Sequence, residues 1–229
     1  MADKSPHYHG HRQRLRQRFD EAGADALPDY ELLELLLCQA LPRRDVKPLA
    51  KRLIERFGTI GSVLGADRRA LKEVAGVGDG VVHTLKLVEA LGVRTLREPI
   101  IGRPVIGTWQ AVLDYCTARL GHNKTEHFRV LFLDNHNALI ADEEQQHGTV
   151  DHVVLYPREV IKRALEHGAS AVVLVHNHPS GNPSPSRADI ELTKEVAKAG
   201  ATLGVTVHDH LVIGRSRHVS FKEAGLLQD

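Results

Sequence analysis

The chain has few cysteines, no long apolar run and almost no net charge. Its two cysteines among 229 residues, Cys38 and Cys116, lie far apart and form no Cys-x-x-Cys pair, which is the usage expected in a reducing cytoplasm. No stretch approaches the roughly 18 apolar residues of a membrane-spanning helix, and the first residues lack the apolar core of a signal peptide. We therefore expect a soluble cytoplasmic protein without a membrane partner.

The charge balance excludes little. A formal net charge of +1 at pH 7 points neither to nucleic acid nor to an acidic substrate. No internal repeat or low-complexity segment stands out. With 42% hydrophobic residues, the sequence can bury a proper core as one large domain or two small ones. The chemistry therefore has to be inferred from motifs.

Residues 97–104 contain two prolines and a glycine and separate two kinds of pattern. Helical periodicity dominates before this segment, and helices alternate with strands after it. We expect an all-helical domain over 1–98 and an α/β domain over 99–229, so the chain as a whole is α+β. The strands are predicted at residues 128–133, 138–141, 149–155, 171–175, 203–207 and 211–213.

The most informative stretch begins where the apolar strand 171–175 ends. His176 and His178 are two residues apart, so their side chains lean to one face, and Asp189 adds a carboxylate from the first turn of the next helix. Two imidazoles and a carboxylate suit Zn²⁺, and three protein ligands leave a fourth position for water, as in catalytic zinc sites. Ser186 and Asp189 also fit a capping box, which would explain the aspartate without a metal.

The order His-x-His-Pro, six residues, Ser, two residues, Asp resembles the signature of the JAMM (MPN-type) zinc metalloproteases. The string His176-Asn177-His178-Pro179-Ser180-Gly181 is similar to one branch of that family, the RadC-type proteins. The resemblance implies an MPN-type α/β domain with a mixed sheet. It also implies a bound Zn²⁺ ion and hydrolysis of peptide or isopeptide amide bonds in a protein or peptide substrate that the sequence does not identify.

A zinc hydrolase also needs a general acid/base that is not a metal ligand. In the family this is a glutamate at the start of an upstream strand, which implies Glu126, although a proline before and a glycine after this segment, frequent in family proteases, are missing. Glu143 and Glu144 are alternatives, because they also lie near a predicted strand end. The family implies that Ser186 donates a hydrogen bond to the oxyanion. That role is compatible with capping, which uses the hydroxyl oxygen as acceptor.

A second His-x-His cluster, residues 208–210, follows the strand predicted at 203–207. By spacing alone it could bind a metal, but it lacks a Ser-x-x-Asp partner. The RadC-type pattern has Asp-His at this place. We therefore expect Asp209 and His210 to support the ligands or to fix the loop, without binding the metal themselves.

Two N-terminal features could contact nucleic acid. Residues 71–88 resemble a helix–hairpin–helix, in which Gly76 and Gly78 expose backbone N–H groups to a DNA phosphate without reading sequence. A hairpin that serves packing only is the alternative. A helix within residues 5–19 carries four arginines that could neutralise phosphates or form a solvated face: Arg12, Arg14, Arg16 and Arg18.

Two functions remain open at this point. The first is a zinc-dependent hydrolase of amide bonds. The second is a DNA-binding repair or replication accessory protein with a structural or vestigial metal site, because RadC-type proteins have carried a DNA-repair label. A metal-dependent nuclease is disfavoured, since many nucleases use two metals bridged by carboxylates.

Overall fold

The computed structural model describes residues 8–147, 155–215 and 217–227. The chain divides into two units, of which the first ends at Leu91 and the second begins at Gly92. This division falls inside α6 (Asp79–Arg97), whereas the sequence pattern places the boundary after residue 98. Helical periodicity continues across the division, so it could not reveal it.

The regular elements described in the first unit are all helical. They are α1 (Tyr8–Ala22), the 3₁₀ turn η1 (Ala24–Ala26), α2 (Asp29–Ala40), α3 (Lys47–Phe57), α4 (Ile60–Gly65), α5 (Arg68–Lys72) and the first part of α6. Side chains begin the short helices, since Thr59 and Asp67 accept hydrogen bonds from backbone N–H groups three residues on. Buried leucines and valines, among them Leu33, Leu53 and Leu85, form one core. The helix–hairpin–helix assignment remains a prediction.

The second unit contains a five-stranded sheet in the order β2-β1-β3-β4-β5. Its strands are β1 (His127–Leu133), β2 (Leu139–His147), β3 (Ala171–Asn177), β4 (Thr206–Ile213) and β5 (His218–Ser220). The pair β3/β4 is parallel and the other three pairs are antiparallel. The predicted mixed sheet is therefore confirmed.

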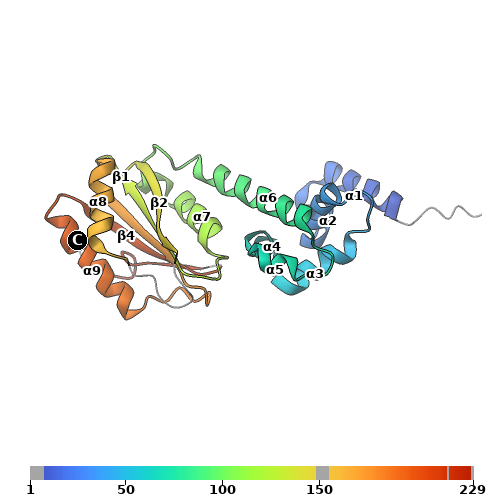
Figure 1. Ribbon diagram of the computed structural model, residues 1–229. Coiled ribbons are helices and arrows are strands. Elements are labelled where there is room, and N and C mark those ends of the chain that lie inside the picture. The colour runs from blue at the N-terminus through green and yellow to red at the C-terminus, as the bar shows by residue number, and fades with distance from the viewer. Residues whose placement is uncertain (1–7, 148–154, 216, 228–229) are drawn as a thin grey trace, which may run out of the picture. The chain divides into compact units, whose positions relative to one another are not determined.

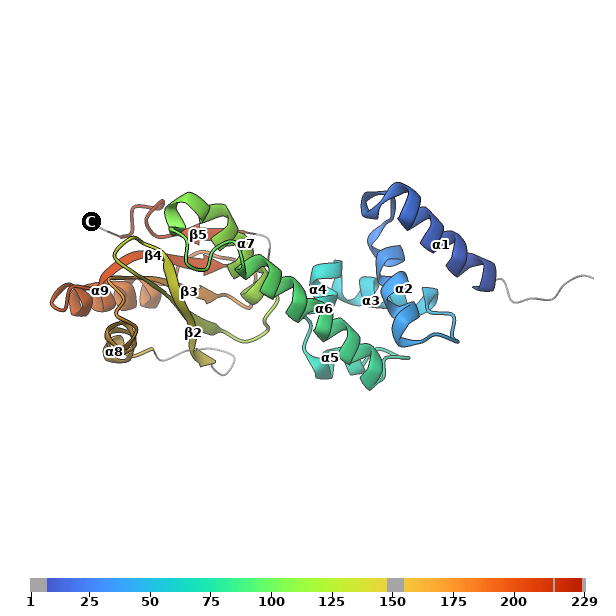
Figure 2. The ribbon, with the colours of Figure 1, turned by 90° about the horizontal axis from the view of Figure 1, so that it is seen from above.

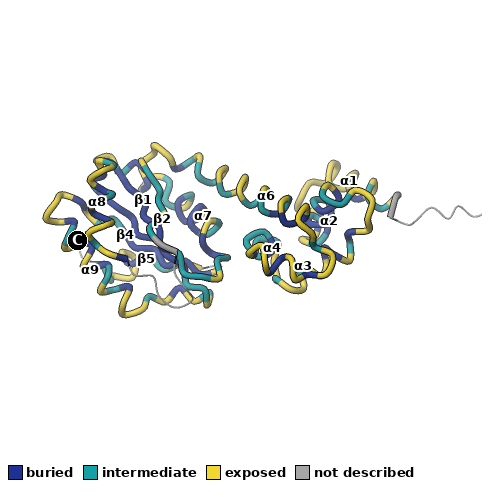
Figure 3. Tube along the Cα trace, in the orientation of Figure 1, coloured by how far each residue is buried: buried dark blue, intermediate teal, exposed yellow. Residues whose placement is uncertain are grey.

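Helices cover both faces of this sheet (Figures 1 and 2). The 3₁₀ turn η2 (Val105–Thr108) and α7 (Trp109–Leu120) lie on one face, and α8 (Pro157–His167) and α9 (Arg187–Ala201) lie on the other. Successive strand residues alternate between two cores, so Val173 packs on the α7 side and Val172 on the α8 and α9 side. In Figure 3 the tube along the sheet is dark blue, because helices bury the strand residues on both faces of the sheet.

Two strand predictions need correction. β2 extends well beyond 138–141, because its acidic residues find basic partners and can therefore remain within a strand. The strands predicted at 203–207 and 211–213 belong to one strand, β4, which begins only at Thr206 and has a bulge at His208, where the register against β3 shifts. β5 was not predicted, because three residues carry too little pattern. The strand expected at 149–155 lies, apart from Leu155, outside the described residues.

None of the helices that the structure describes is both long enough and apolar enough to cross a membrane.

Candidate metal centre

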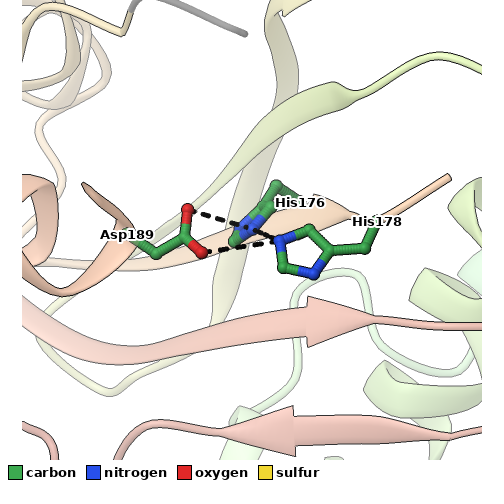
Figure 4. A group of neighbouring side chains, drawn as sticks. All are labelled: His176, His178 and Asp189. Carbon is green, nitrogen blue, oxygen red and sulfur yellow. Dashed lines mark hydrogen bonds and ion pairs between the residues drawn. The ribbon is translucent and has the colours of Figure 1, made fainter. Parts of the chain in front are cut away.

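Three side chains meet at the end of β3 that leads into α9. His176 belongs to β3, His178 follows the strand, and Asp189 lies in the first turn of α9. The two Nε2 atoms are 3.0 Å apart, and each lies 3.4 Å from an oxygen of the Asp189 carboxylate (Figure 4). Among the side chains that the structure describes, this is the one group of three or more potential metal ligands whose donor atoms all lie within 4.8 Å of one another.

The cap of α9 orients the carboxylate. Ser186 Oγ accepts a hydrogen bond from the Asp189 N–H at 3.1 Å, and Asp189 Oδ2 accepts one from the Ser186 N–H at 2.6 Å. This is a complete capping box. Capping and approach to the histidines therefore coexist, because the reciprocal bonds hold the Asp189 side chain while it faces the imidazoles.

His178 presents an Nε2 lone pair because its other nitrogen is engaged. Its Nδ1 lies 2.9 Å from the backbone carbonyl of Asn182, which only accepts, so Nδ1 carries the proton of the neutral ring. The contact with Asp189 raises the pKa of His178 although burial lowers it, and the carbonyl of Asn182 and the charge of Glu126 add to the rise. A cation at Nε2, whether a proton or a metal ion, is thus favoured.

A chain of buried hydrogen bonds likewise places the proton of His176 on Nδ1 and leaves a lone pair on its Nε2. Thr193 Oγ donates to the Asp189 carbonyl at 2.6 Å, so it accepts from His210 Nδ1, also at 2.6 Å. Burial lowers the pKa of His210 well below its ordinary value, so this ring is neutral and its Nε2 accepts from His176 Nδ1 at 2.8 Å. His176 is consequently left with a bare Nε2, and the chain returns to the backbone of Asp189.

This donor set fits zinc. Two nitrogen lone pairs and a carboxylate are all acceptors, so without a cation they repel one another. Burial raises the pKa of Asp189, but its contacts with His176 and His178 outweigh that effect and hold the pKa well below the ordinary range. Ligand atoms about 2.0–2.1 Å from a tetrahedral zinc lie roughly 3.3 Å apart, and the observed separations are 3.0 and 3.4 Å.

Glu126 precedes β1 on the face that carries the ligands. In the β1/β3 ladder Phe128 pairs with His176, and their rings are stacked with centroids 5.6 Å apart. Extending this antiparallel register by two residues places Glu126 opposite His178, and the alternation of side chains puts it on the same face as Phe128. The effect of the Glu126 charge on the pKa of His178 agrees with this position.

The alternative glutamates do not lie near a strand end, so that expectation was wrong. Both lie within β2, where their partners come from β1 and α8. The hydrogen bond from Arg163, with His167 contributing, lowers the pKa of Glu143 to about 2. Glu144 contacts His127 and Arg129, so both carboxylates are held in ion pairs.

The second His-x-His cluster lies inside β4 and not in a loop after a strand, because the bulge lets the strand continue. Asp209 is 2% exposed and accepts hydrogen bonds from Ser220 Oγ, the Lys222 N–H and the His210 N–H, so it fastens β4 to β5 and the turn that follows. His210 instead contacts His176. Thr193 was not predicted from the sequence, although a hydroxyl one helical turn after Asp189 was a usable signal.

The predicted phosphate contacts belong to the first unit. Arg12 donates to the carbonyls of Leu41, Pro42 and Arg44 beyond the end of α2. Arg18 pairs with Glu31, while Arg14 and Arg16 are exposed. Gly76 has a φ of 97°, which favours glycine, and Gly78 precedes α6 with open space beside it. The preceding carbonyl, Ala75 O, accepts from Arg52 at 3.0 Å.

Comparison with known proteins agrees with this architecture. Residues 106–226 match the family model described as a RadC-like JAB domain, so fold and site define a JAB/MPN-type domain with a possible metal site. A UPF0758 protein from Rhodobacter capsulatus is 60% identical over 213 residues, which is 93% of this chain and all of that protein. The chain belongs to the RadC-type UPF0758 family.

Proposed function

We propose that this protein is a zinc-dependent hydrolase that cuts peptide or isopeptide amide bonds. The observation that carries the proposal is the convergence of the His176 and His178 Nε2 atoms on the Asp189 carboxylate. The β1/β3 register, extended by two residues, brings Glu126 opposite His178. His176, His178 and Asp189 would hold the ion. Zinc bound there supplies Lewis acidity that activates water and polarises the substrate carbonyl.

Each other residue has one task. The Glu126 carboxylate takes a proton from the attacking water and returns it to the leaving amine, so the C–N bond breaks while a C–O bond forms. The Ser186 hydroxyl proton has no part in the capping bond, and it would stabilise charge on the former carbonyl oxygen. The hydrogen bond between His176 and His210 is fully buried, so competition from water does not weaken it.

The test measures metal and cleavage together. About one zinc per chain should co-purify, as read by native mass spectrometry, and the double variant His176→Ala/His178→Ala should lose it. Asp189→Ala should lose zinc together with some thermal stability, since it also removes one of the two hydrogen bonds of the capping box. Wild type should cut members of a peptide library. Equal zinc in wild type and the double variant would overturn the site, and zinc without any amide cleavage would overturn the hydrolase.

A DNA-binding accessory role is the second candidate, and the exposure of Arg14 and Arg16 favours it. The full-length chain should then bind duplex DNA weakly, without sequence preference and less tightly as salt rises. Arg14→Ala/Arg16→Ala should reduce the salt dependence by roughly one unit of slope per arginine. The control Arg12→Ala should leave it unchanged, because Arg12 is engaged within the unit. Binding that ignores salt would argue against phosphate contacts.

A further inference from the structure

Asn177 lies between the two histidine ligands and faces the opposite side of the sheet. It is 1% exposed, and strand alternation turns its side chain away from His176, toward the α7 side. A buried carboxamide needs partners for one acceptor and two donor positions. The residue is therefore placed for a role that its metal-binding neighbours do not share.

Within the part of the chain that the structure describes, the side-chain hydrogen bonds of Asn177 go to the segment that enters β1. Asn177 Oδ1 accepts from the His127 N–H at 2.9 Å, and Nδ2 donates to the carbonyls of Thr125 at 3.0 Å and Asn123 at 3.4 Å. The Thr125 carbonyl belongs to the peptide bond before Glu126, and the His127 N–H belongs to the peptide bond after it. One carboxamide thus fastens both peptide groups that flank Glu126.

We propose that Asn177 is a positioning residue that fixes Glu126 relative to the ligands on either side of it, His176 in β3 and His178 just after the strand. This inference rests on the function proposed for Glu126. Asn177 is bonded directly to His176 and His178 along the chain. Its hydrogen bonds therefore fix the positions of the two peptide groups around Glu126 relative to these histidines. Substitution by aspartate would retain the acceptor and lose both donors, so only the amide serves all three backbone groups.

The test uses the full-length protein loaded with Co²⁺ and needs no substrate. The pH dependence of the visible Co²⁺ spectrum is compared for wild type, Glu126→Gln, Asn177→Ala and the double variant. A neighbouring negative charge disfavours proton loss near the ion, so removing the Glu126 charge should lower the apparent pKa of the spectrum by about one unit. Asn177→Ala should lower it in the same direction, and the double variant should equal Glu126→Gln alone. Exchange of the His127 amide hydrogen should also speed up in Asn177→Ala.

A matched control separates placement from stability. Val173→Ala removes a buried side chain from the same strand and the same face, so it should lower the melting temperature without shifting the spectrum. If Asn177→Ala does not fold, Asn177→Ser replaces it, since its hydroxyl fills part of the space but cannot reach all three backbone groups. A wild-type spectral titration in a folded Asn177 variant, or additive shifts in the double variant, would overturn the proposal. A failure to hydrolyse any amide would leave these spectra unchanged, so it refutes only the proposed function.

Discussion

The hairpin before α6 and the centre at the end of β3 are both rich in polar groups, yet they satisfy them in opposite ways. Around the hairpin the two lysines find acceptors: Lys72 pairs with Asp79, and Lys86 contacts Glu89 and the Leu64 carbonyl. At the end of β3 two imidazoles and a carboxylate converge on one another. Opposite charges neutralise each other in the first region, whereas converging acceptors make the second a possible site for a cation.

The largest effect is expected for Glu126→Gln, which changes the residue preceding β1, at the end of that strand that faces the centre. The amide is nearly isosteric but cannot take a proton, so hydrolysis should fall by about 10²–10⁴-fold or more while zinc content and melting temperature are retained. Peptide cleavage and zinc are measured on the same preparation. Glu143→Gln and Glu144→Gln should keep cleaving, because those carboxylates are held in ion pairs. Full activity in Glu126→Gln together with loss in either control would move the acid/base role to β2.

Thr193→Val tests the hydrogen-bond chain that keeps the lone pair on His176 Nε2. Valine matches the shape of threonine but leaves the His210 Nδ1–H without an acceptor, so His176 is no longer held in the tautomer that exposes Nε2. Zinc affinity, measured by competition with a chelator, should weaken about 10–100-fold. Thr193→Ser should restore it, and Thr202→Val, on the exposed end of the same helix, should change nothing. Wild-type affinity in Thr193→Val would break the proposed link.

Lowering the pH should replace the metal by protons. Zinc binding must displace a proton from His178, so affinity should fall about tenfold per unit of pH once that ring is protonated. Chelator competition between pH 5 and 8 gives the slope, and His83→Gln, an exposed histidine of the first unit, should leave it unchanged. A flat profile would show that no histidine proton is exchanged.

In the metal-free protein, obtained with a chelator, protonation of His178 should stabilise the fold, whereas in the zinc-bound protein it should weaken metal binding. The pKa of His178 is raised above 6.5, so its contribution to stability is complete below that value and is lost as pH rises through the folded pKa. Asp189, whose pKa is lowered from 3.8, contributes above that value and loses its contribution as pH falls through the folded pKa. Melting temperatures of the metal-free protein, measured from acid pH to above pH 7, test both contributions.

The smallest effect is expected in the helical unit. Arg12→Ala removes the donors to carbonyls beyond α2 and should lower the free energy of unfolding by about 1 kcal/mol, without any change in zinc content. Denaturant titration measures this, with the exposed Arg14→Ala as control. A loss of zinc in Arg12→Ala would contradict the division between an architectural and a chemical region.

The elements that were predicted well are those with a local cause. Helix α8 begins with a proline and is followed by a left-handed glycine, and the apolar run of β3 is buried along its whole length. The extension of β2 and the continuity of β4 were not predictable, because they depend on cross-strand ion pairs and a bulge. The same limit applied to Glu143 and Glu144, whose partners come from β1 and α8.

The sequence by itself determined the group of potential metal ligands. His176 and His178 lie at the end of one strand, and Asp189 lies in the first turn of the helix that follows. Strand alternation and a capping box therefore suffice to bring the three side chains together. Only the tertiary structure decided which nitrogen each histidine offers. That feature depends on the pairing of β3 with β4, which brings His210 against His176, and on α9, from which Thr193 contacts His210.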